Sequence, residues 1–176
     1  MEWPGQWRRV QELVDAHYLA LYRYAYRLSG SATEAEDLTQ DVFCKAQMQL
    51  HQLRNPERVK PWLFTILRNA YLHRVRNERS HRSVSLDAVG DLPERIANLP
   101  PEIDAEELQK ALSELPEAFR AAVILFYFEE FSYREIAEHL NVPIGTVMSR
   151  LARAKAHLRE RLAAQALNSR RSANGL

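Results

Sequence analysis

The strongest constraint on the fold of this chain lies in residues 132–147, which read SYREIAEHLNVPIGTV. Ser132 and Glu135 have the spacing of a capping box, in which each side chain bonds a free backbone N–H at the start of a helix. Asn141 tolerates the left-handed conformation that ends many helices. Pro143 then suits the first turn of a new helix, where its missing N–H is not needed. The segment therefore predicts two helices joined by a tight turn.

Two helices in this arrangement form a helix-turn-helix, whose second helix enters the major groove of DNA. Apolar residues of the second helix recur at three- and four-residue steps and predict its buried face: Val147, Leu151, Ala154, Leu158 and Leu162. The opposite face offers four polar candidates for contact with DNA: Thr146, Ser149, Arg150 and Arg153. An arginine can bind guanine in bidentate fashion, which is worth about 1–3 kcal/mol of base discrimination.

An ordinary helical hairpin with a basic surface would share some of these features. Here the capping signals, the small residue Ala137 at the helix crossing and an arginine-rich outer face occur together. Their coincidence favours DNA binding over a plain hairpin. Lys155, Arg159 and Arg161 lie farther along the helix and are expected to meet phosphates or solvent.

The rest of the chain also indicates helix, since it has only 5 glycines in 176 residues and no sustained strand-like alternation. Residues 123–128 have strand propensity, but they continue a helical face and have no partner strand. We therefore expect an all-α fold of two small helical domains joined by a flexible acidic linker, the C-terminal domain being the helix-turn-helix. The expected limits are 6–80 for the first domain, 81–102 for the linker, 103–166 for the second domain and 167–176 for a frayed tail.

The charges fall into blocks that the net charge of +1 conceals. Residues 54–82 carry a net charge of +6, residues 87–117 carry −7, and residues 150–171 carry +6. Basic blocks attract phosphate and acidic blocks repel it. Each block could instead be a solvated helix face, but the pattern favours a protein that grips DNA at two separated places.

The N-terminal domain is expected to contain three helices. The first spans residues 6–28, Ser31 and Glu34 form a capping box for the second, and Pro61 opens the third after a loop at 51–59. The third helix has an outer face of cationic and amide side chains, which suits a DNA backbone or an unstacked base. The candidates on this helix and the loop before it are Arg54, Asn55, Lys60, Arg68, Asn69, His73 and Arg76.

Several function classes are excluded by what the chain lacks. Cys44 is the only cysteine, so neither an internal disulfide nor a multi-cysteine metal site is expected. No Gly-rich phosphate loop, paired-histidine metal spacing or nucleophile constellation is present, so we expect no enzymatic activity, no cofactor and no metal. The longest apolar run, residues 121–128, is far shorter than the roughly 20 residues of a membrane span. Together with the absence of a signal peptide, this predicts a cytoplasmic protein without membrane insertion.

Three motifs resemble the extracytoplasmic-function (ECF) group of bacterial RNA polymerase sigma factors. Residues 35–43, AEDLTQDVF, are similar to the polymerase-binding helix of this family. Residues 62–69, WLFTILRN, are similar to its −10 element helix. Residues 115–120 and 145–154 are similar to its −35 binding domain. The resemblance covers residues 8–165 in the order and spacing of the family, which makes it far more specific than any one motif.

The resemblance implies roles for the candidate residues. Asp37, Gln40 and Asp41 would contact the β′ clamp helices of core RNA polymerase, whose β flap is a further implied contact. Asn69 and its neighbours, with the 51–59 loop, would melt and hold the −10 strand. The four candidates of residues 146–153 would read the −35 element as a duplex. The linker would occupy the RNA path of the polymerase, and an anti-sigma factor is the implied regulator.

One position departs from the family pattern. His73 stands four residues after Asn69, where the family usually has an aspartate. An acid there would repel phosphate, whereas histidine would not; His73 could also be a tolerated surface residue. A self-sufficient helix-turn-helix regulator is the alternative function, and it predicts tight specific binding to duplex DNA without polymerase.

Overall fold

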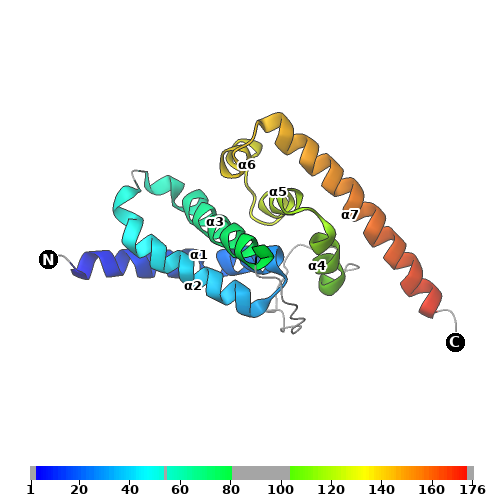
Figure 1. The fold of residues 1–176 in the computed structure, drawn as a ribbon, viewed down its shortest axis with the longest axis horizontal. Helices are drawn as coiled ribbons and strands as arrows, with labels where there is room; N and C mark the ends of the chain where they lie inside the picture. The colour runs from blue at the N-terminus through cyan, green and yellow to red at the C-terminus, as the bar shows by residue number, and fades with distance from the viewer. Residues whose placement is uncertain (1–2, 54, 81–103, 174–176) are drawn as a thin grey trace. The chain divides into compact units, whose positions relative to one another are not determined.

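The computed structural model describes residues 3–53, 55–80 and 104–173, and these ranges contain helices and turns but no strand (Figure 1). The chain forms two compact units, one with helices α1–α3 and the other with α4–α7. The all-α prediction is therefore confirmed. The acidic linker expected at 81–102 and the candidate Arg54 lie outside the described residues.

The first unit consists of α1 (Trp3–Ser29), α2 (Ala32–Gln49) and α3 (Val59–Ser80). Between α2 and α3, where the sequence predicts a loop, the chain makes two short 3-10 turns, η1 (Leu50–Gln52) and η2 (Pro56–Arg58). The backbone N–H of Glu34 donates to Ser31 Oγ at 3.3 Å, so the serine caps α2 as predicted. The N–H of Glu57 donates to Asn55 Oδ1 at 2.9 Å and caps η2.

Aromatic and aliphatic side chains from all three helices form the core of this unit. The rings of Tyr24 on α1 and Phe64 on α3 are fully buried, with centroids 5.0 Å apart. The hydroxyl of Tyr71 donates to the carbonyl of Leu28 at 3.1 Å, which fastens α3 to the end of α1. Burying one large apolar side chain stabilises a fold by about 1.5–3 kcal/mol. The core therefore holds α2 and α3 rigidly while their outer faces stay accessible.

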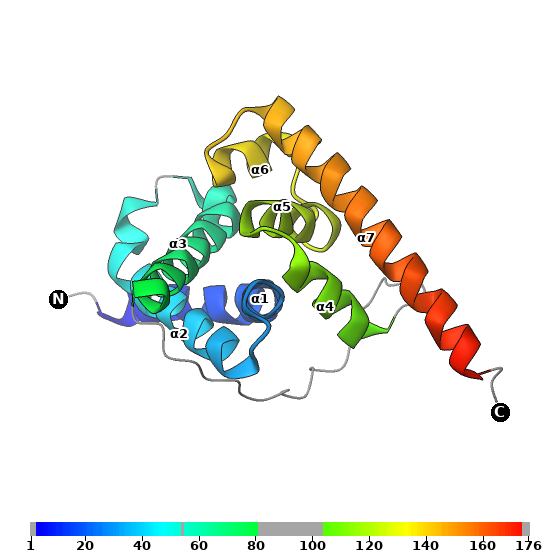
Figure 2. The same cartoon turned by 45° about the vertical axis from the view of Figure 1, so that its right-hand side comes forward.

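The second unit consists of α4 (Ala105–Glu114), α5 (Glu117–Tyr127), α6 (Tyr133–Leu140) and α7 (Ile144–Ala173). Helix α7 packs against each of the other three, and α5 packs against α6 (Figure 2). Residues 121–125 of α5 are buried, and residues 123–127 are helical despite their strand propensity. A helix that buries its apolar residues in this way confirms the choice of helix made from the sequence.

The turn between α6 and α7 has the geometry that the sequence predicts. The N–H of Glu135 donates to Ser132 Oγ at 3.3 Å and the N–H of Ser132 donates to Glu135 Oε2 at 2.8 Å, which completes the capping box. Asn141 has φ 53° and ψ 52°, in the left-handed region. The next N–H, that of Val142, donates to the carbonyl of Ala137 at 3.0 Å. These contacts set the direction in which α7 leaves the turn.

The structure differs from the sequence prediction at the C-terminus. Helix α7 continues to Ala173, whereas the sequence predicted a frayed tail from residue 167. Residues 163–167 are Ala, Ala, Gln, Ala and Leu, all strong helix formers that propagate a helix already started by its packed N-terminal half. A polar tail is therefore compatible with helix when the preceding residues favour it.

Candidate functional site

The first candidate surface is the outer face of α7, which we call the α7 outer face and define as Thr146, Ser149, Arg150 and Arg153. Ser149 and Arg153 are exposed, and Thr146 and Arg150 are half-buried. The opposite side of the helix is packed into the unit through Val147, Leu151 and Ala154. The hydroxyl of Ser149 donates to the carbonyl of Thr146 at 3.0 Å, which leaves its oxygen lone pairs as acceptors.

The arginines of α7 differ in whether they form an ion pair. Farther along the helix, Arg161 Nε donates to both carboxylate oxygens of Glu114 at 2.9 Å. His157 Nε2 lies 3.7 Å from the same carboxylate, so Glu114 holds α4 against this part of α7. Within the described parts of the chain, neither Arg150 nor Arg153 has an ion pair. In the described structure, the guanidinium groups nearest the turn thus have no carboxylate partner that would compete with phosphates or base edges.

The second candidate surface is the outer face of α3, defined as Asn69, His73 and Arg76. The three side chains are exposed, and their spacing of four and three residues places them on one side of the helix. Arg76 Nε donates to the carbonyl of Leu72 at 3.2 Å, and His73 Nδ1 lies 3.4 Å from Asn77 Nδ2. Beside these local contacts, the side chains of Asn69 and Arg76 remain exposed.

The other predicted residues of this region lie apart from the α3 outer face. Lys60 Nζ lies 5.8 Å from the ring centroid of Phe64, over a buried aromatic ring. Burial, and secondarily the charge of Lys60, lower the pKa of His17 on α1 below its ordinary value. Arg68 is half-buried and lies beside the α3 outer face rather than on it. The structure thus brings together Asn69, His73 and Arg76 and directs Lys60 toward α1.

The third candidate surface is on α2 and carries Asp37, Gln40 and Asp41. Arg74 on α3 links the two carboxylates, since its Nη2 lies 2.6 Å from Asp41 Oδ2 and its Nη1 lies 3.8 Å from Asp37 Oδ2. The side chains of Asp37 and Asp41 are still 59% and 49% exposed, so both can also meet a partner. The sequence analysis missed Arg74, because only the packing of α2 on α3 brings it to this surface.

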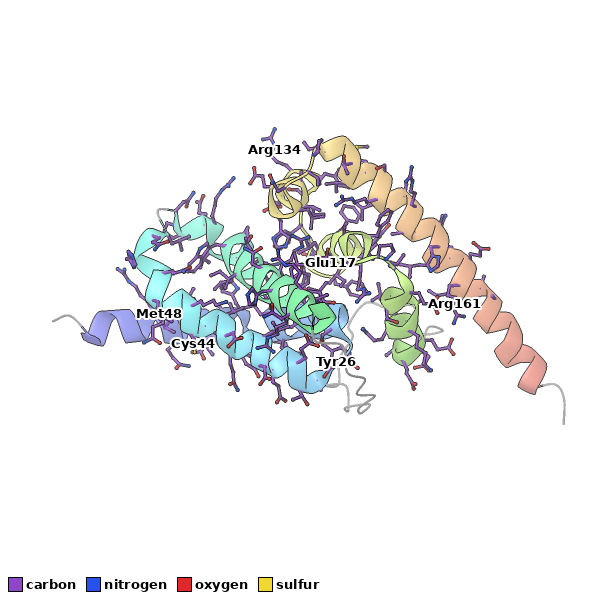
Figure 3. The ribbon with its side chains drawn as sticks, viewed as in Figure 1. Tyr26, Cys44, Met48, Glu117, Arg134 and Arg161 are labelled. Carbon is purple, nitrogen blue, oxygen red and sulfur yellow. The ribbon has the colours of Figure 1, made fainter. Side chains whose placement is uncertain are left out.

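The α2 surface continues past the predicted residues. Cys44 and Met48 follow Asp41 at three and seven residues, which places them on the same side of the helix, and both are labelled on α2 in Figure 3. Met48 is 68% exposed and Cys44 is exposed. We call this set the α2 face and define it as Asp37, Gln40, Asp41, Cys44 and Met48. The spacing of Cys44 and Met48 from Asp41 in the sequence could have predicted that both lie on this face.

The structure was also searched for other kinds of site. In the ranges that it describes, no group of three or more histidine, cysteine, aspartate or glutamate side chains is arranged to hold a metal ion. Among the same residues, no helix combines the length and the apolar character needed to cross a membrane.

Comparison with known families gives two matches. Residues 13–81 match the model of sigma-70 region 2, and residues 105–158 match the model of sigma-70 region 4. The first match includes the α2 face and the α3 outer face, and the second includes the α7 outer face.

Known proteins are similar over most of the chain. The ECF RNA polymerase sigma factor SigE of Mycolicibacterium smegmatis is 38% identical over 92% of this chain, which spans 65% of that protein's length. The ECF RNA polymerase sigma factor SigM of Bacillus subtilis is 30% identical over 85% of this chain and 93% of its own length. The sigma factor RpoE of Bartonella quintana, solved in complex with the anti-sigma factor NepR, is 35% identical with a TM-score of 0.75, over 87% of this chain and 95% of that one.

Proposed function

The chain belongs to the ECF RNA polymerase sigma factors, and on this premise we propose that its three surfaces share the work of promoter-directed transcription initiation. The α2 face would bind core RNA polymerase, the α3 outer face would hold the −10 element and the α7 outer face would read the −35 element. The observation that carries this division is the helix-turn-helix geometry, with Arg150 and Arg153 free of ion pairs within the described residues.

The α7 outer face suits duplex DNA. Arginines at the start of a recognition helix reach base edges in the major groove, and a bidentate contact with guanine adds about 1–3 kcal/mol of discrimination. The hydroxyl of Ser149 can accept from a base amino group, and Thr146 lies one helical turn before it. Arg161 would contribute little to this readout, because Glu114 occupies its guanidinium group.

The α3 outer face suits an unpaired strand. An amide such as that of Asn69 can both donate to and accept from the edge of an unstacked base, while Arg76 offers charge to the strand backbone. His73 adds no negative charge that would repel phosphate. Asn55, Lys60 and Arg68 would act at the border of this surface, with Lys60 nearer to α1.

The α2 face suits a partner helix that is basic and partly apolar. Asp37 and Asp41 supply negative charge, and the exposed Met48 supplies a flexible apolar contact at the other end. The clamp helices of the β′ subunit are the partner proposed for it, with the β flap as a second contact of the chain. A protein working in this way needs no catalytic group, cofactor or metal of its own, and it would act in the cytoplasm.

An anti-sigma factor is the proposed regulator. The support is the likeness to RpoE of Bartonella quintana, which was solved with such a partner. A regulator that covers the α2 face or the α7 outer face would block polymerase or promoter, and both faces are exposed enough to be covered.

Transcription in vitro tests the proposal. Core RNA polymerase is mixed with a genomic promoter library, with and without this protein, and the transcripts are sequenced. We expect initiation that depends on the protein and starts downstream of a shared two-part promoter. Failure to initiate, together with specific duplex binding by the protein alone, would instead indicate an independent helix-turn-helix regulator.

A further inference from the structure

Two large apolar side chains are exposed at the start of α7. Ile144 and Met148 are 43% and 53% exposed. They are four residues apart, so they lie on the same side of the helix. The pair lies next to the packed side of the helix, since Leu151 follows Met148 by three residues, but unlike Val147, Leu151 and Ala154 it is not buried. The pair is therefore an exposed apolar surface at the start of α7, separated from Arg150 by the packed stripe but on the same first turns of the helix as Thr146 and Ser149.

Gly145 lies between these two residues and leaves open space beside them. A Cβ built on Gly145 would have no atom within 4 Å, and among the described glycines it is Gly30, not Gly145, that has a positive φ. Alanine favours helix more than glycine does, so neither packing nor backbone conformation in this unit calls for glycine here. Its absent side chain lets a partner come close to the helix backbone.

The charge around the pair indicates what that partner is. Residues 144–159 include no aspartate or glutamate, and they include the cations Arg150, Arg153, Lys155 and Arg159. Such a surface attracts a polyanion. The major groove of duplex DNA presents one distinctive apolar group to such a helix, the C5-methyl of thymine. Apolar side chains among cations thus match the groove itself, since phosphates alone would need only the cations.

We propose that Met148, with Ile144 beside it, contacts the C5-methyl group of a thymine in the −35 element and selects an A·T pair there. This rests on the proposed −35 role of the α7 outer face and adds a base that the arginines do not read. The thioether of Met148 is flexible and polarisable, so it can follow a methyl group in the groove. The arginines would supply phosphate and guanine contacts, and Met148 would supply thymine preference.

Replacement of thymine by deoxyuridine tests this contact, because it removes the methyl group and keeps the base-pairing edge. Holoenzyme, made from core RNA polymerase and the full chain, first selects binding sites from duplexes with a randomised −35 element. Each thymine of the selected element is then replaced singly by deoxyuridine. We expect binding about three- to fivefold weaker at one or two positions, as for the loss of one buried methyl group.

Variants of Met148 connect that loss to the side chain. Met148→Ala should bind thymine and deoxyuridine equally at those positions, and Met148→Leu should keep the preference for thymine. Tyr127→Ala is the matched control, because Tyr127 is 50% exposed on α5 of the same unit and its loss should leave the preference intact. Since Met148 is exposed, Met148→Ala should unfold at the same urea concentration as the natural chain.

Two results would overturn the contact. One is a selected −35 element with no thymine whose methyl group affects binding. The other is a methyl dependence that persists in Met148→Ala. The double variant Arg150→Ala with Arg153→Ala separates the inference from its premise: if that variant loses −35 dependence while deoxyuridine has no effect, only the methionine contact is wrong. If it retains −35 dependence, the proposed role of the α7 outer face is wrong as well.

Discussion

The guanidinium group of Arg74 lies 2.6 Å from the carboxylate of Asp41, joining α3 to the exposed face of α2. The pair is partly exposed, so we expect it to stabilise the fold by no more than about 1 kcal/mol. Its larger effect concerns binding, because a cationic partner that reaches Asp41 must share it with Arg74. Association through this face should therefore weaken as salt is added.

Reversal of both α2 carboxylates is the direct test of polymerase binding. Asp37→Arg with Asp41→Arg would set positive charge against both Arg74 and a basic partner, and like-charge contacts at an interface cost several kcal/mol. We expect affinity for core polymerase to fall by more than about 100-fold, measured by fluorescence anisotropy of labelled protein. The matched control is Glu12→Arg with Asp15→Arg, the same charge change at two exposed positions of α1. Equal loss in both variants would mean that net charge, rather than the α2 face, governs association.

Removal of the Asn69 amide should impair strand opening more than initial binding. Asn69→Ala leaves the helix intact, because the residue is exposed and alanine favours helix. We expect slower formation of open complexes, followed by permanganate reactivity of unpaired thymines, with closed-complex affinity little changed. A promoter with a premelted −10 element should restore activity. Gln11→Ala, which removes an exposed amide from α1 of the same unit, is the control. An absence of rescue would place the role of Asn69 elsewhere.

Removal of Arg150 and Arg153 should separate promoter recognition from polymerase binding. Arg150→Ala with Arg153→Ala should lower transcription from −35-dependent promoters by about tenfold or more, as expected from the loss of one or two bidentate contacts. Affinity for core polymerase should not change. Arg161→Ala removes one positive charge from the same helix, from a guanidinium already bound to Glu114, so its effect on promoter choice should be small. An equal loss on a promoter with only an extended −10 element would contradict a −35 role.

Stability should fall at mildly acidic pH because of His17. Burial, with the charge of Lys60 second, lowers the pKa of His17 below its ordinary value of 6.5. The unfolded chain then binds a proton more readily than the folded chain, so the His17 contribution is complete above pH 6.5 and is lost as pH falls through the folded-state pKa. Urea unfolding at about pH 5 to 8 measures this effect. As the pH is lowered, the free energy of unfolding should fall less in His17→Gln than in the natural chain.

Lys60 provides an internal check on that prediction. Lys60→Gln removes the second cause of the lowered pKa and leaves the first, so it should reduce the pH dependence only in part. If the pH dependence of unfolding is unchanged in His17→Gln, groups other than His17 cause the loss of stability at acidic pH.

Much of the helix-turn-helix was predictable because its signals are local. Ser132 and Glu135 are three residues apart, and Asn141 ends α6 through its own backbone conformation. The faces of α2, α3 and α7 follow from helical period, so the exposure of Asp37, Asn69 and Arg153 could be predicted as well. The end of α7 was less predictable, because its polar tail gave no stop signal and the helix continued.

Side-chain contacts between different helices could not be predicted from these local sequence signals. Arg74 reaches Asp41 across 33 positions, and Arg161 reaches Glu114 across 47. Each long cationic side chain had several partners within reach of its charge, and only the packing of α3 on α2, or of α7 on α4, selects one. Packing also directed Lys60 over Phe64, away from the other −10 candidates.

The order of capping residues, turns and apolar positions thus specifies the helices and their exposed faces, since these depend on neighbours within about four residues. The tertiary structure decides which cations remain free for DNA, because an ion pair needs two side chains that the folded core brings together. Arg150 and Arg161 differ little in the sequence, yet only Arg161 meets a carboxylate in the described structure. The availability of a charge for binding is therefore a property of the fold.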